Sequence, residues 1–279
     1  AIDGSFDDAQ AMVKRMFADQ EVTSRFSISA VNSINWARLM AQVVYYFYAA
    51  SQLGGPHRKI SFSVPTGNFG DVFAGYVAER MGLPIERLIV ATNVNDILHR
   101  ALSAGDYSTG TVTPTAAPSM DIQVSSNFER LLFDLEGRDG GKTAARMAAF
   151  EQSRNMQLDS SMRDQASALF TSHRVDPDDM ALAMRWAQDR AGQVIDPHSA
   201  IGLSAAQNAD LDPAVPVVTL ATAHPAKFPD AVERATGIRP ALPRRVGDLF
   251  DRDEKYTKLP GEYDAVKQFI TANATPSDG

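Results

Sequence analysis

The sequence predicts an α/β fold built on a parallel sheet that helices cover. The first observation is an alternation of strand and helix patterns, joined by short loops, between residues 59 and 102. The second is length, since 279 residues suffice for one large domain or two modest ones. The third is composition, because 44% hydrophobic and 22% charged residues are typical of a globular protein with a substantial core.

Two helices are expected before the first strand. Residues 6–17 place Phe6, Val13 and Phe17 on one face at helical spacing. A second helix follows Asn32, with Ser33 as its expected N-cap. The expected buried stripe of that helix consists of Trp36, Met40, Val43, Val44 and Phe47.

Strand and helix patterns then alternate. Residues 59–65 alternate apolar residues with serines, which predicts a short strand with small residues on its second face. After a turn that contains Gly67 and Gly70, a helix runs from Asp71 to Gly82. A strand over 87–92 and a helix over 96–102 complete the βαβα pattern.

The second half of the chain is expected to be mainly helical. Residues 105–124 form a surface loop, a helix covers 127–135, and residues 141–192 are helical with no strand candidate. Helices begin at Asp176-Pro177 and Asp196-Pro197, where proline suits the first turn. The last elements expected are a buried strand over 215–220, a loop over 221–228, a helix over 229–236 and a tail with one short helix.

Composition also excludes several function classes. The 34 acidic and 27 basic residues give a net charge of -7, which argues against broad binding to nucleic acid or to anionic membranes. Without cysteine there are no disulfides, thiolate zinc sites, iron–sulfur clusters or cysteine nucleophiles. No run of about 20 apolar residues and no signal peptide is present. We therefore expect a cytoplasmic protein, and, because the chain begins with Ala1 rather than Met, a piece of a longer one.

The clearest local signal for chemistry is residues 61–71, which read strand, glycine-flanked turn and helix start. Gly67 and Gly70 allow a tight turn, and the amides of Phe69 and Gly70 at a helix N-terminus favour an anion such as phosphate. Asp71 is expected to order the loop or cap the helix, because like charges repel. A turn that binds nothing remains the alternative.

Two further segments carry polar groups at suitable places. Asn32, Ser33 and Asn35 begin a helix with Arg38 one turn on, a second candidate anion site, although the local evidence favours an ordinary cap and a solvated arginine. Residues 220–228 follow a strand, where ligands of open α/β sheets bind. Thr222 can bond a ring nitrogen there, whereas loop residues such as His224 and Lys227 are more often structural or solvated. No spacing supports a metal site or a hydrolase triad.

The segments "PTGNFGD", "NSINWAR" and "TAHPAKF" together resemble the threonine synthase family of the longer type. These are fold-type II pyridoxal-phosphate (PLP) enzymes, with helices on both faces of a parallel sheet. The resemblance covers most of residues 1–250. It implies PLP as cofactor, with its phosphate held by a loop and Thr222 bonded to its ring nitrogen. The implied loop residues are Gly67, Asn68, Phe69, Gly70 and Asp71.

The resemblance also implies a substrate and a reaction. Members convert O-phosphohomoserine and water to threonine and phosphate. Asn32, Ser33, Asn35 and Arg38 match the stretch that is expected to help bind the substrate phosphate. The implied division is a cofactor-phosphate domain (1–135 and 195–237), a mainly helical region of it (136–194) and a wrapping C-terminal tail (238–279). The oligomeric state is left open.

One departure from the family pattern concerns catalysis. The family's Schiff-base lysine lies in a Phe-Lys-Asp motif, and none of the seven lysines of this chain has that context. We therefore expect no catalytic residue in this chain, and no activity from it alone. Two alternatives remain open, a non-catalytic piece that binds phosphate or PLP, and another fold-type II lyase such as a serine or threonine deaminase.

Overall fold

The computed structural model describes residues 1–4, 6–29 and 35–275. The chain separates into two compact units. The larger unit is Trp36–Pro243, and the smaller one combines Ala1–Asn35 with Arg244–Gly279.

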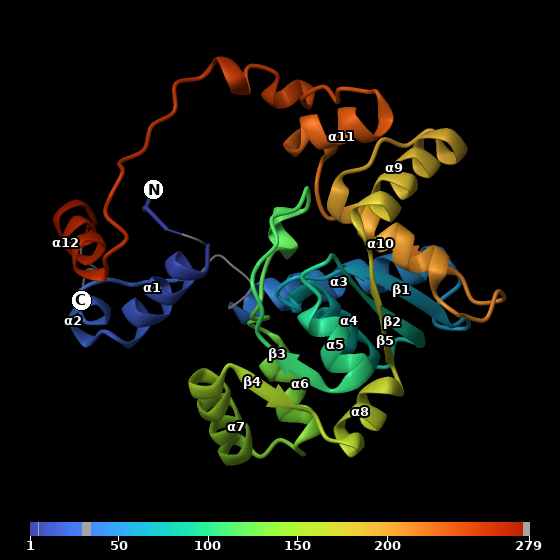
Figure 1. Ribbon diagram of the computed structural model, residues 1–279, viewed down its shortest axis with the longest axis horizontal. Coiled ribbons are helices and arrows are strands. Elements are labelled where there is room, and N and C mark those ends of the chain that lie inside the picture. Colours follow the sequence, from blue (N-terminus) through green and yellow to red (C-terminus); the bar gives the residue numbers. More distant parts are fainter. Residues whose placement is uncertain (5, 30–34, 276–279) are drawn as a thin grey trace. The chain divides into compact units, whose positions relative to one another are not determined.

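A four-stranded parallel sheet forms the centre of the larger unit (Figure 1). β1 (Ile60–Pro65) lies between β2 (Ile85–Thr92) and β6 (Val217–Thr219), and β5 (Phe170–Arg174) pairs with the other side of β2. The order is β5-β2-β1-β6, so all carboxyl ends meet at one edge. The predicted parallel sheet is confirmed.

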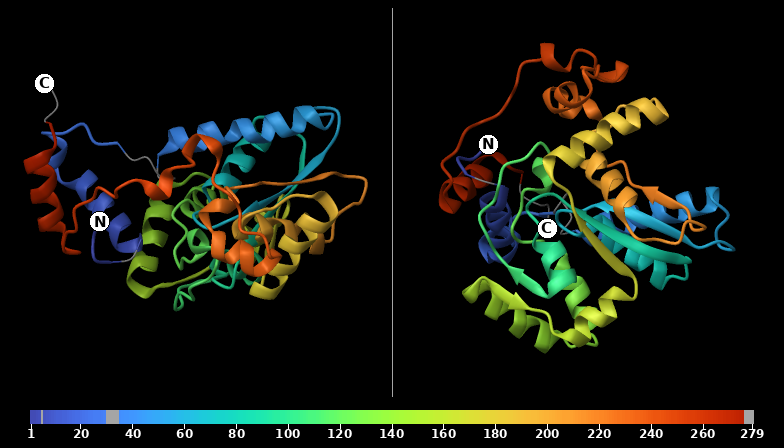
Figure 2. Two further views of the ribbon diagram at one scale, coloured as in Figure 1. Left: turned by 90° about the horizontal axis from the view of Figure 1, so that it is seen from above. Right: turned by 45° about the vertical axis from the view of Figure 1, so that its right-hand side comes forward.

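Helices cover both faces of this sheet, as expected (Figure 2). On one face α4 (Gly70–Arg80) packs on β1 and β2, with α3 (Trp36–Gln52) against it. On the other face α10 (Pro197–Asn208) packs on β1, β2 and β6. Behind α10 lie α9 (Pro177–Ala191) and then α11 (Pro229–Thr236).

The remaining elements of the larger unit form a helical layer with one small antiparallel pair. The pair joins β3 (Asp106–Ser108) to β4 (Asn155–Gln157). The helices of this layer are α5 (Ile97–Ala104), α6 (Phe128–Leu135), α7 (Gly140–Ser153) and α8 (Ser160–Ser167). Short 3-10 turns, η1 (Pro118–Met120) and η2 (Pro225–Lys227), lie in the loops.

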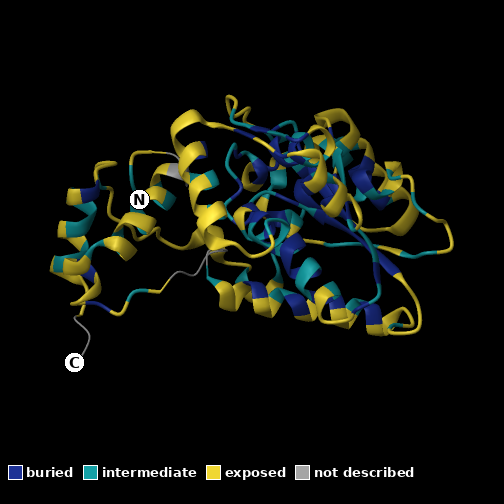
Figure 3. Ribbon diagram, turned by 90° about the horizontal axis from the view of Figure 1, so that it is seen from below, coloured by how far each residue is buried: buried dark blue, intermediate teal, exposed yellow. Residues whose placement is uncertain are grey.

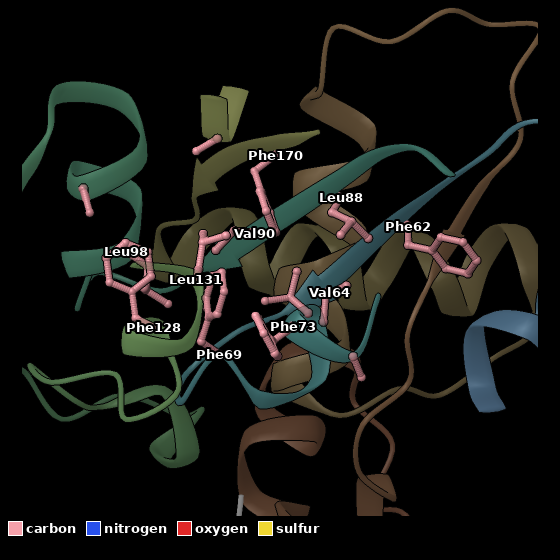
Figure 4. Packing of buried hydrophobic residues seen from close by; sticks show 14 of the residues in the cluster. Phe62, Val64, Phe69, Phe73, Leu88, Val90, Leu98, Phe128, Leu131 and Phe170 are labelled. Atoms are coloured by element: carbon pink, nitrogen blue, oxygen red, sulfur yellow. The ribbon is translucent and has the colours of Figure 1, made fainter. Parts of the chain in front are cut away.

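The strands separate two hydrophobic cores because their side chains alternate between faces. Phe62, Val64, Leu88 and Val90 point into the larger core with the rings of α4 and α6 (Figure 4). Ile89 and Ala91 point the other way, toward Ile201 of α10. β1 and β2 are buried along most of their length, whereas Figure 3 shows the outer faces of the helices as exposed.

The serines of β1 explain how closely α10 approaches. Ser63 Oγ donates to Gly202 O at 2.6 Å, and a Cβ on Gly202 would lie 2.9 Å from Pro65 Cγ. Small residues on both elements therefore let the helix backbone lie directly on the sheet. This confirms the predicted small second face of the strand.

Three predictions that concern strands were wrong. The surface loop expected over 105–124 contains β3. The region 141–192 contains β4 and β5, although no strand was expected there. β5 reads Phe-Thr-Ser-His-Arg, and an edge strand needs no apolar alternation, so its sequence gave no strand signal. The strand expected over 215–220 is β6, only 217–219, and it is a half-exposed edge strand rather than a buried one, with Val217 37% exposed.

The predicted buried face of α3 was also wrong. Leu39, Val43, Tyr46 and Ala50 are buried, whereas Trp36, Met40, Val44 and Phe47 are largely exposed. The helix is apolar on nearly every side, so periodicity alone cannot choose a face. The tertiary contact chooses it, because Gly75 of α4 leaves room for the Tyr46 ring, and a Cβ there would lie 2.6 Å from Tyr46 Cε1.

The smaller unit joins the two ends of the chain. It contains α1 (Phe6–Ala18), α2 (Gln20–Thr23) and α12 (Tyr263–Asn273), with 3-10 turns at Arg244–Val246 and Leu249–Asp251. Asp19 accepts from the Tyr263 hydroxyl at 2.7 Å and from Lys267 Nζ at 2.8 Å. The helices expected at both ends are confirmed, while the division of the chain by function stays a prediction.

Candidate functional site

The turn between β1 and α4 and the first two residues of α4 contain the five residues predicted to bind the cofactor phosphate. Phe69 has φ 62, in the left-handed region, and occupies the N-cap position of α4. Its side chain cannot accept a hydrogen bond, so the first-turn amides of α4 have no N-cap side chain. The structure therefore places Gly67, Asn68, Phe69, Gly70 and Asp71 together at the carboxyl end of β1. We call residues 67–70 the cradle loop.

The start of α6 holds the cradle loop from outside. Asn127 donates to Asn68 O from its backbone N at 3.1 Å and from Nδ2 at 2.9 Å. Ser126 Oγ donates to Asn68 Oδ1 at 3.2 Å, and Ser125 Oγ donates to Gly67 O at 2.8 Å. Among the described residues, no acceptor contacts Asn68 Nδ2. Sequence reasoning missed these three residues, although they form one run just before a recognised helix.

The η1 segment packs on the other side of the cradle loop. A Cβ on Gly67 would lie 2.6 Å from Ser119 O, so the two backbones are in direct contact. Asp121 secures the loop that leads there, since Asn93 Nδ2 donates to it at 2.7 Å and Thr115 N at 2.7 Å. The cradle loop is thus fixed by two segments that are distant in sequence.

Asp71 is not the N-cap residue of α4; it lies in the first turn and joins α4 to α3, and its role in ordering the loop stays a prediction. The Tyr46 hydroxyl of α3 donates to Asp71 O at 2.7 Å and to Asp71 Oδ1 at 3.2 Å. Burial raises the pKa of Asp71 to about 6, while the Tyr46 hydrogen bond acts in the opposite direction. The carboxylate beside the cradle loop therefore gains or loses its charge near pH 6.

Replacing Asp71 by asparagine should change how stability depends on pH. The raised pKa means that the folded protein holds this proton more tightly than the unfolded chain does. The wild type therefore loses stability relative to Asp71→Asn as pH rises from about 4 through 6, by at most about 3 kcal/mol. Urea unfolding at pH 4.5 and pH 8 measures this difference. Asp210→Asn, an exposed control, should show no such trend, and a pH-independent difference for Asp71→Asn would refute the assignment.

Thr222 lies three residues beyond β6, the strand next to β1. Leu220 N donates to Ser63 O at 3.0 Å, so the chain leaves the sheet alongside β1. Thr222 is exposed, and its backbone N donates to Ser199 Oγ at 3.1 Å. His224 caps η2 by accepting from Ala226 N at 3.1 Å, which gives it the structural role considered for it.

The predicted substrate-phosphate residues lie partly within and partly outside the described residues. Asn32 and Ser33 lie outside the described residues. Asn35 and Arg38 are described, and both have interaction partners. Their role in binding substrate stays a prediction.

All seven lysines lie in the described part of the chain, and none is a buried amine. Six of them are exposed, and Lys267 is partly buried between Asp19 and Glu21. The hydrogen bonds that Lys267 donates to these two carboxylates raise its pKa far above the ordinary value. A Schiff-base lysine needs the opposite environment, because its amine must be free of its proton to attack a carbonyl.

A cavity of about 1030 Å³ opens beyond β2 and β5, and its lining includes Asn93, Arg174, Asp230 and Lys227 but no residue of the cradle loop. Its lining mixes both signs of charge, so it favours no single class of ligand. Among the described residues no cluster of side chains is suited to a metal ion. None of the helices that these residues form combines the length and apolar character that a membrane span requires.

Comparison with known proteins identifies what this arrangement is similar to. Residues 199–270 match the family described as threonine synthase, C-terminal. Threonine synthase of Pseudomonas aeruginosa is 53% identical over 272 residues, and that of Corynebacterium glutamicum is 42% identical over 280. Each match covers 97% of this chain and 58% of the relative.

Solved structures agree. The crystal structure of PLP-bound threonine synthase from Brucella melitensis superposes with a TM-score of 0.88 at 50% identity, over 98% of this chain and 58% of that one. Threonine synthase from yeast superposes with a TM-score of 0.84 at 38% identity, over 97% of this chain and 58% of that one. The predicted resemblance and fold are confirmed. Residues 199–270 are thus similar to the C-terminal part of threonine synthases, and the chain as a whole is similar to a little under three fifths of such an enzyme.

Proposed function

We propose that this chain is the cofactor-phosphate-binding part of a threonine synthase. The whole enzyme converts O-phosphohomoserine and water to threonine and phosphate. The main support for this proposal is the cradle loop at the carboxyl end of β1. The chain that contains it is similar to threonine synthases over 97% of its length. The proposal includes a cytoplasmic location, which a chain without cysteine permits.

The residues of the cradle loop fit a phosphate. The first-turn amides of α4 have no N-cap side chain, and helix N-termini attract anions through those amides and the helix dipole. Asn68 Nδ2 adds a donor, while Asn127 and Ser126 fix the backbone and the side chain of Asn68. The crowded contact of Gly67 with Ser119 keeps the loop in one conformation before any ligand arrives.

Thr222 fits the other end of the cofactor. A neutral hydroxyl donates to the pyridine nitrogen without protonating it, which keeps the electron sink moderate. When bound, PLP supplies that sink for loss of phosphate from the substrate and addition of water. Asn32, Ser33, Asn35 and Arg38 would hold the substrate phosphate. The lysine that forms the Schiff base and transfers protons belongs to the part of the enzyme outside this chain.

A chemical trapping experiment tests this division of roles. One equivalent of PLP is added to the purified chain, borohydride is added to reduce any Schiff base, and the products are mapped by mass. We expect no stoichiometric lysine adduct and no threonine formation from O-phosphohomoserine. A single adduct at Lys59 or Lys227, or measurable threonine, would overturn the assignment of the reactive lysine to another part of the enzyme.

Asn68→Ala should weaken retention of PLP in the full-length enzyme. Loss of one hydrogen bond to a charged phosphate costs about 1–3 kcal/mol, so the dissociation constant should rise roughly 5- to 150-fold. Equilibrium dialysis of PLP measures it. Asn155→Ala is the matched control, since Asn155 is an exposed asparagine on β4. Equal retention by the two variants would count against the cradle loop as the phosphate site.

A further inference from the structure

A buried polar cluster lies behind the candidate site, at the start of α10. Asp196, His198 and Ser199 are all almost fully buried, and Asp196 is 0% exposed. Asp196 Oδ1 accepts from His198 Nδ1 at 2.9 Å, and Asp196 Oδ2 accepts from the Ser199 hydroxyl. Ion pairs and polar groups in this position are costly to bury, so the arrangement calls for an explanation beyond stability.

The direction of each hydrogen bond follows from chemistry. Burial alone would raise the pKa of Asp196, but hydrogen bonds from His198 and Ser199 outweigh it and lower that pKa, so the carboxylate is ionised and only accepts. The single proton of Ser199 therefore goes to Asp196, and its oxygen accepts from Thr222 N at 3.1 Å. His198 carries its proton on Nδ1, which leaves Nε2 to accept from Ser119 N at 3.2 Å.

The two chains of hydrogen bonds end at the two loops that carry the proposed site. Through His198, the carboxylate holds Ser119, whose carbonyl oxygen is in contact with Gly67 of the cradle loop. Through Ser199, it holds the backbone of Thr222. The His198 ring also packs on Phe228, with centroids 4.8 Å apart, which fixes the far end of the same loop.

We propose that Asp196, His198 and Ser199 form a positioning cluster that sets the placement of Thr222 relative to the cradle loop. This inference rests on the proposed function. A rigid ligand with phosphate at one end and a ring nitrogen at the other needs both contacts at a fixed separation. None of the three residues touches the ligand; one buried carboxylate orients both loops that do.

Ser199→Ala tests the cluster against a close control. Ser204→Ala removes another buried serine hydroxyl from the same helix, away from Thr222. Binding of PLP and of inorganic phosphate to the 279-residue chain is measured by calorimetry. For Ser199→Ala we expect the dissociation constant of PLP to rise about tenfold and that of phosphate to stay unchanged, because phosphate uses the cradle loop alone. Ser204→Ala should change neither.

A double-mutant cycle separates positioning from general damage. If Ser199 acts through Thr222, then Ser199→Ala should cost no further PLP affinity once Thr222→Ala is present. His198→Phe should weaken the binding of phosphate as well as that of PLP. Ser119, which packs against the cradle loop, then loses its hydrogen bond to His198 Nε2. Should Ser199→Ala fail to fold, Ser199→Cys takes its place in these experiments. Its side chain can still donate to Asp196.

The outcomes distinguish the inference from the proposed function. A wild-type chain that binds neither PLP nor phosphate overturns the proposed function and the positioning cluster together. A wild type that binds both, with Ser199→Ala behaving like Ser204→Ala, overturns the cluster alone. A further tenfold loss of PLP affinity when Ser199→Ala is added to Thr222→Ala also overturns the cluster, because Ser199 would then not act through Thr222.

Discussion

Phe69→Ala is expected to lower the free energy of unfolding by about 3–5 kcal/mol, because it removes a fully buried aromatic ring. Phe69 is 1% exposed, and its ring lies 5.3 Å from that of Phe128 and 5.7 Å from that of Phe170, centroid to centroid (Figure 4). The ring also holds the backbone in the left-handed region, which costs a residue other than glycine about 1–2 kcal/mol. Without the ring, no packing contact of residue 69 holds the cradle loop in that conformation.

Phe69→Gly gives a sharp comparison. Glycine adopts φ 62 without strain, so this variant should be no less stable than Phe69→Ala, although it removes one more carbon. Urea unfolding of both variants and the wild type measures the difference. A Phe69→Ala variant within 1 kcal/mol of wild type would show that the ring does not anchor the loop.

Gly67→Ala is expected to raise the dissociation constant for inorganic phosphate at least tenfold. The added Cβ would lie 2.6 Å from Ser119 O, a backbone atom that cannot rotate away. Either the cradle loop or η1 must move, and such overpacking costs about 1–3 kcal/mol. The donors of the loop then no longer meet at one point.

Gly140→Ala is the control for this substitution, because nothing lies within 4 Å of its added Cβ. Calorimetry with inorganic phosphate and thermal unfolding are measured on both variants. We expect Gly140→Ala to match wild type in both. Unchanged phosphate affinity in Gly67→Ala would mean that the anion, if bound, does not depend on the geometry of this loop.

Local signals were reliable wherever one face of an element is clearly apolar or a turn residue is compulsory. The strand over 59–65, its glycine turn and the following helix were all predicted, because alternation, Gly67 and Gly70 act within ten residues. The proline-led starts of α9 and α10 were predicted for the same reason. The composition of β5 is polar, and as an edge strand it gives no such signal.

The sequence by itself determined the parallel α/β fold, the cradle loop at 67–70 and the resemblance to threonine synthases. These depend on local periodicity, glycine placement and contiguous motifs. Only the tertiary structure decided which face of α3 is buried, and that Ser125, Ser126 and Asn127 hold the cradle loop. It alone joined Ser119 and Thr222 to Asp196. The hydrogen bonds that reach Ser119, Thr222 and the cradle loop link residues 23 to 79 positions apart, and a hydrogen bond between residues so distant in sequence depends on how the elements pack rather than on any local pattern.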